Sequence, residues 1–134
     1  MHADERQAVK TANTLRFWRD GMLGHLEKIR DGEATDETFV ALERDLKTSE
    51  KEARRAMTVL RTLRSRIGGG QLAKLIDNIV QSDGYGKEVI RYEINSLLTT
   101  RKAGNDVKSK ALEICNQIAI LNGELDRLHR LVYG

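Results

Sequence analysis

The chain has 134 residues, of which 40% are hydrophobic and 32% charged, and its net charge is +3 at pH 7. This size and mixture predict one soluble domain over residues 1–134, with a core that needs neither a disulfide nor a metal. The single cysteine, Cys115, excludes a disulfide within the chain, and no apolar run is long enough to cross a bilayer.

The amino terminus is polar, so it does not resemble a secretory signal. Together with the lone cysteine, this leads us to expect a cytoplasmic protein that has no membrane partner. The chain contains no proline, and only 4% of its residues are aromatic. Because proline is the commonest helix breaker, its absence favours long helices over a sheet.

The first predicted helix covers about residues 4–30, and its apolar stripe includes Leu15, Trp18 and Met22. A turn at 31–35 follows, with a glycine as the stop signal. The second predicted helix covers 36–67 and ends at the three glycines 68–70. Thr35 is its candidate cap. Thr38, three residues later, is not the acid or amide that completes a capping box.

The second helix keeps a spacing of three or four residues between the positions of one face. Nine positions follow this register: Phe39, Leu42, Leu46, Ser49, Ala53, Ala56, Leu60, Leu63 and Ile67. Only a helix aligns such residues on one face, and another helix offers the matching seam. The last predicted helix, about 105–131, has the same spacing from Val107 to Val132, and Asn105 or Asp106 can cap it.

The third segment, 71–101, carries a helical register that is interrupted. Ile76 and Ile79 set this register, and it returns at Ile90 and Ile94. If the register continued between them, Asp83 and Gly86 would occupy core positions, and Gly84 would lie next to Asp83. Because glycine weakens a helix interior, we predict that this helix is broken or kinked near residues 82–86.

Short turns between long helices place neighbouring helices antiparallel. The predicted fold is therefore all-α: an antiparallel up-down four-helix bundle with long helices, whose third helix is interrupted. A slender bundle buries less surface per residue than a compact one. An apolar stripe that stays exposed could then support a homodimer.

Positive charge is concentrated in residues 51–74, which contain seven basic residues and one acidic residue. With Phe39 at heptad position a, the outward positions b, c and f hold Arg44, Lys47, Lys51, Arg54, Arg55 and Arg61. The acids Glu43, Asp45, Glu50 and Glu52 fall at e and g, where we expect them to pair with neighbouring helices. The basic stripe is then left with few local partners.

Such a stripe is either an ordinary solvated helix face or a surface for an anionic partner. The partner could be another protein or a nucleic acid, and both classes stay open from the sequence. Tyr85 and Lys87, in the interrupted part of the third segment, are further candidate contacts. No aromatic residue interleaves with the stripe, so stacking on single-stranded bases is not supported there.

Side chains that could perform catalysis are sparse. The chain has three histidines, and serine, cysteine and histidine do not form a nucleophile-and-base pattern. The single Asp126-x-x-His129 pair falls short of a carboxylate metal site in a bundle. We therefore predict a protein that is not an enzyme and has no metal or cofactor: a helical interaction module, adaptor or inhibitor, or alternatively a nucleic-acid-binding accessory protein.

Overall fold

The computed structural model describes residues 2–82 and 89–134, and these form five helices without a strand. The helices are α1 (His2–Arg30), α2 (Asp36–Ile67), α3 (Gln71–Ser82), α4 (Val89–Lys102) and α5 (Lys108–Tyr133). The all-α class is confirmed. The second predicted helix matches α2 at both ends, and the first matches α1 to within two residues.

The third predicted helix corresponds to two helices, α3 and α4. The interruption was predicted near 82–86. Ser82 is the last residue of α3, and residues 83–86 lie outside the described part of the chain. The last helix begins at Lys108, three residues later than predicted, after the N-cap residue Val107. The predicted cap Asp106 still contributes, because its Oδ1 accepts a hydrogen bond from the Lys108 backbone N–H at 3.1 Å.

Local hydrogen bonds explain the turn between α1 and α2. Gly32 has a φ of +76°, a conformation that glycine adopts without a Cβ clash, and the Glu33 N–H donates to the Lys28 carbonyl at 2.9 Å. The expectation that Thr38 cannot complete a capping box is wrong. The Thr38 hydroxyl accepts a hydrogen bond from the Thr35 backbone N–H at 3.1 Å, and it thus replaces the carboxylate or amide acceptor that usually completes a capping box.

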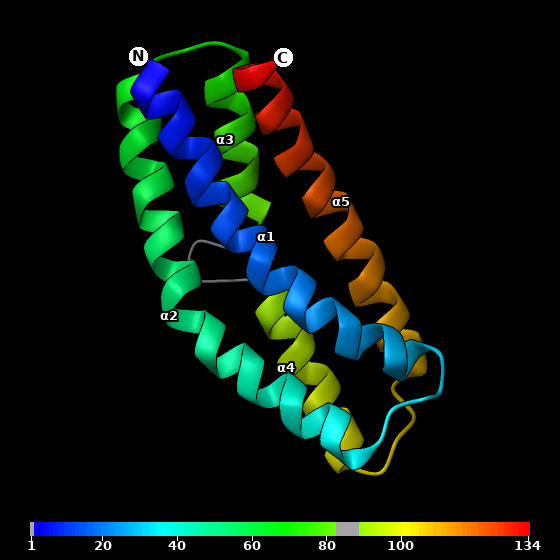
Figure 1. The fold of residues 1–134 in the computed structure, drawn as a ribbon. Coiled ribbons are helices and arrows are strands. Elements are labelled where there is room, and N and C mark those ends of the chain that lie inside the picture. Colours follow the sequence, from blue (N-terminus) through cyan, green and yellow to red (C-terminus); the bar gives the residue numbers. More distant parts are fainter. Residues whose placement is uncertain (1, 83–88) are drawn as a thin grey trace.

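The helices run side by side along a slender molecule (Figure 1). Helix α1 packs against α2 and α5, while α3 and α4 each pack against both α2 and α5. Figure 1 shows α3 beside the end where both termini lie, and α4 toward the other end. One end of the molecule therefore gathers the start of α1, the end of α2, the start of α3 and the end of α5.

The predicted registers form the core. In α2 the buried positions include Leu42, Leu46, Ser49, Leu60 and Leu63, and Phe39, Ala53 and Ile67 are partly buried. The register of α5 is buried from Val107 to Leu128. Burial of these side chains is the main stabilising term of such a fold.

The apolar core is divided into two clusters. One lies toward α4 and includes Leu26 and Ile94, and the other lies toward α3 and includes Leu60 and Ile76. On α1 and α2, the residues of the two clusters are separated in sequence by a buried polar residue, Arg19 on α1 and Ser49 on α2, each 4% exposed. The first-helix register placed Trp18 in the stripe. The structure buries Arg19 there and leaves Trp18 half-buried.

Candidate interaction surface

Five of the predicted contact residues lie on the exposed side of α2. We call this set, Arg44, Lys47, Lys51, Arg54 and Arg55, the α2 basic face. All five residues are exposed. The exposed fraction of the side chain is 64% at Arg54 and Arg55, 69% at Arg44 and 76% at Lys47. Arg61 was assigned to the same outward stripe, but it is half-buried and does not belong to this face. Tyr85 and Lys87 lie outside the described residues.

The expectation that the basic stripe has few local partners is wrong. Four of the five cations lie beside a carboxylate one turn or less away: Arg44 with Asp45 at 3.5 Å, Lys47 with Glu43 at 3.8 Å, Arg54 with Glu50 at 2.8 Å and Arg55 with Glu52 at 3.5 Å. Among the described residues, only Lys51 of this face has no carboxylate partner. The α2 basic face is therefore a mosaic of both charges.

Three of these carboxylates, those of Glu43, Asp45 and Glu50, also contact neighbouring helices, as their heptad positions predicted. Among the described residues, Glu52 contacts only Arg55 of its own helix. The Oε1 atom of Glu50 lies 2.8 Å from Arg91 of α4, and Glu43 lies 3.7 Å from Lys102. On the other side, His25 Nε2 of α1 lies 2.9 Å from Asp45 Oδ2. These contacts hold the acids in place next to the cations of the α2 basic face.

The α2 basic face is hollowed. Lys47, Lys51, Arg54 and Arg55 line an open depression of about 740 Å³ together with Glu50, Thr58 and Val59. Val59 is 38% exposed and is the apolar member of this lining. The depression therefore offers cations, a carboxylate, a hydroxyl and an apolar side chain to one partner.

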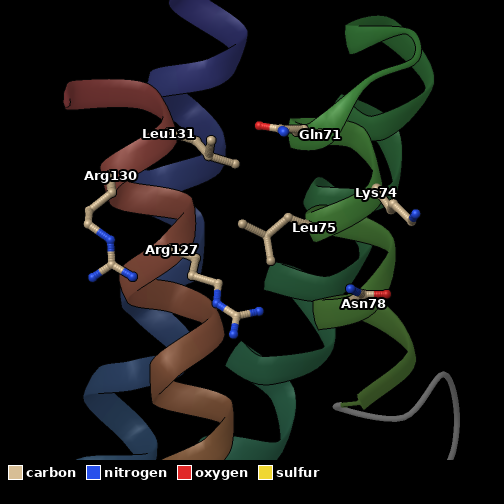
Figure 2. A pocket seen from close by; sticks show the side chains of 7 residues that line it. All are labelled: Gln71, Lys74, Leu75, Asn78, Arg127, Arg130 and Leu131. Carbon is tan, nitrogen blue, oxygen red and sulfur yellow. The ribbon is translucent and has the colours of Figure 1, made fainter.

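A second hollow lies between α3 and α5, near the end of the molecule that carries the termini (Figure 2). This groove has a volume of about 370 Å³ and is lined by Gln71, Lys74, Leu75, Asn78, Arg127, Arg130 and Leu131. Figure 2 shows Leu75 and Leu131 pointing toward one another across the groove, while Lys74 and Arg130 point outward from the two helices. The groove thus has an apolar centre and cationic edges.

The charge of this groove differs from that of α2. Within the described residues, Lys74 and Arg130 have no carboxylate partner, and Arg127 pairs with Glu124 at 3.4 Å. Lys74 belongs to the basic segment 51–74, but Arg127 and Arg130 were not predicted as contact residues. The available signal was topological, because an up-down bundle brings residue 74 and the end of the last helix together.

Other reactive side chains have ordinary structural surroundings. Cys115 is 7% exposed, and burial raises the pKa of its thiol, so it is a core residue with little thiolate at neutral pH. The His129 ring packs on Tyr133, with 4.9 Å between centroids. In the part of the chain that the structure covers, no three His, Cys, Asp or Glu side chains are placed to hold a metal ion.

Comparison of the chain with protein-family models, with curated proteins and with solved structures gave no match. Within residues 2–82 and 89–134, no helix has both the length and the apolar character of a membrane span.

Proposed function

We propose that this chain is a non-catalytic interaction module that binds an acidic surface of another protein through the α2 basic face. The proposal includes the arrangement of the helices as an antiparallel four-helix bundle, in which α3 and α4 together take the place of the third helix. In that arrangement α2 keeps one face on the core and presents the opposite face along its length. The partner then meets a rigid helix, which lowers the entropy lost on binding.

The observation that carries this proposal is the composition of the depression on α2. Four cations surround it, and Val59 and Thr58 extend it along the helix. A protein partner can place carboxylates against Lys51 and Arg55 and an apolar side chain against Val59. Arginine is among the residues that most often dominate protein interfaces.

The ion pairs of the α2 basic face favour a protein over a nucleic acid. Exposed pairs such as Arg55–Glu52 are worth at most about 1 kcal/mol each, so a partner can rearrange them. The carboxylates nevertheless stay beside the cations, and a run of phosphates would meet both. A protein surface carries both signs of charge and can pair with each. Nucleic-acid binding through this same face is the alternative.

A peptide selection tests the proposal. A phage-displayed library of random peptides is panned against the full-length chain, and the enriched peptides are then measured by fluorescence polarisation. We expect acidic peptides with one apolar residue. Lys51→Glu combined with Arg55→Glu should weaken them by about 2 kcal/mol, or roughly 30-fold in Kd. Lys28→Glu combined with Lys108→Glu makes the same charge change at other exposed sites and should have little effect.

Three results would contradict the proposal. The first is enrichment of neutral peptides, and the second is equal loss of binding in both double variants. The third is tight binding of a labelled DNA duplex that disappears in the Lys51→Glu, Arg55→Glu variant and falls log-linearly with salt, which would support the nucleic-acid alternative. Light scattering of each variant checks that its mass and assembly state are unchanged.

A further inference from the structure

The carboxyl-terminal turns of α5 lie between α1 and α3 and form a second charged surface. On the α1 side, Arg6 and Lys10 line an open depression of about 550 Å³ with His129 and Tyr133. On the α3 side is the groove of Figure 2, with Lys74 and Arg130 at its edges. We call Arg6, Lys10, Lys74, Arg130 and Tyr133 the terminal band.

The cations of the terminal band lack ion-pair partners within residues 2–82 and 89–134. Among the described residues, Arg6, Lys10, Lys74 and Arg130 have no carboxylate partner. The nearby carboxylates are engaged elsewhere: Asp4 pairs with Arg66, Asp77 with Arg64 and Asp126 with Arg16. This is the opposite of the α2 basic face, where most cations lie beside an acid.

The band crosses three helices. Arg127 and Arg130, three residues apart on α5, line the groove on the α3 side. His129 of the same helix lines the depression on the α1 side. The outward face of α5 therefore separates the two hollows. Neighbouring helix axes lie about 8–10 Å apart, so the path from α1 to α3 across α5 covers roughly 20 Å. A partner that reaches all four cations must carry negative charges spread over this distance, as an extended polyanion does.

The remaining lining groups identify the chemistry of that partner. Amide side chains accompany the cations on both sides, Gln7 and Asn13 in one hollow and Gln71 and Asn78 in the other. Lysine, arginine and amide side chains are the groups that contact phosphates and sugars. Tyr133 is 52% exposed and packs on the His129 ring, so an aromatic surface stands beside the cations. Such a ring can stack on a base.

We propose that the terminal band binds single-stranded nucleic acid. A flexible strand can enter both hollows and cross the α5 ridge, whereas a duplex is stiff over far longer distances and would span them. An acidic peptide is a weaker fit, because the α1–α5 hollow is lined mainly by polar side chains and offers few apolar contacts. This site is separate from the α2 basic face, so a chain using both would connect a protein to a nucleic acid.

Salt dependence of binding tests the number and place of the contacts. The probe is a labelled oligothymidine, followed by fluorescence anisotropy. Four contacts on a single strand predict a slope of about −2.8, so affinity should fall roughly 50-fold between about 50 and 200 mM salt. For Lys74→Ala combined with Arg130→Ala, the slope should be about −1.4 and the fall about 7-fold. Lys28→Ala combined with Lys108→Ala, the matched control, should keep the parent slope.

A second pair of variants tests stacking. Tyr133→Ala should weaken oligothymidine binding about 5- to 150-fold, the usual range for one stacked base. Tyr92→Ala removes another exposed tyrosine, on α4, and should leave binding unchanged. The proposal is overturned if oligothymidine fails to bind at low salt, if a duplex of equal length binds more tightly, or if polyglutamate competes equally well. Equal slopes for both lysine-containing double variants would also overturn it.

Discussion

Leu60→Ala is the sharpest test of how the core is organised. The Leu60 side chain is fully buried in α2, in the cluster that also contains Ile76 and Leu128. The substitution removes three carbons, which costs about 2.4 kcal/mol at roughly 0.8 kcal/mol for each buried carbon group. The cavity left behind raises the total to about 3–4 kcal/mol, because the surrounding helices relax only partly.

The expected shift in Tm follows from chain length. At about 2.1 cal/mol/K per residue, 134 residues have an unfolding entropy of about 0.28 kcal/mol/K, so Tm should fall by roughly 11–14 °C. Thermal and urea unfolding followed by far-UV circular dichroism measure both quantities. Val40→Ala is the matched control, because Val40 lies on the same helix and is 65% exposed. A loss below about 1 kcal/mol at Leu60, or equal losses in the two variants, would refute this packing.

Three further predictions concern local chemistry. Burial raises the pKa of the Cys115 thiol, so its alkylation at neutral pH should be slow in the native protein and fast in urea; equal rates would contradict its burial. A hydrogen bond from Arg30 lowers the pKa of Asp31 in the folded protein. This pairing therefore stabilises the folded state at pH values above the pKa of Asp31 in the unfolded chain, and the stabilisation is lost as the pH falls through the pKa in the folded protein. Arg30→Gln should therefore raise that pKa in an NMR titration, and no change would contradict the pairing. Gly104, at a φ of +85°, and Gly21, inside α1, should respond oppositely: Gly104→Ala should destabilise and Gly21→Ala should stabilise, each by about 1 kcal/mol in urea unfolding. Shifts of the same sign would contradict the assigned backbone conformations.

The contact residues were predicted less well than the helices. Exposure of Lys47, Lys51 and Arg54 follows from the heptad, because a residue opposite a buried seam faces outward. Arg61 has the same heptad position as Arg54, yet it is half-buried. Heptad position describes one helix, whereas burial also depends on how closely the neighbouring helix approaches.

Local pairing explains why the basic stripe has more partners than predicted. Acids at e and g positions do reach neighbouring helices, as in the contact between Glu50 and Arg91. The same Glu50 oxygen also lies 2.8 Å from Arg54, one turn along its own helix. A carboxylate accepts several hydrogen bonds, so a partner on another helix does not prevent a partner on its own.

By itself, the sequence determined the helices and their buried faces. Spacing of three or four residues is a property of one segment, and the end signals act within a few residues of it. The tertiary structure alone decided which cations from distant parts of the chain lie together. Arg6 and Arg130 are at opposite ends of the sequence, and both come to lie at one end of the molecule, where Arg130 lines the same groove as Lys74. The interaction between two charges depends on the distance between them, and for residues far apart in the sequence only the packing of the helices sets that distance.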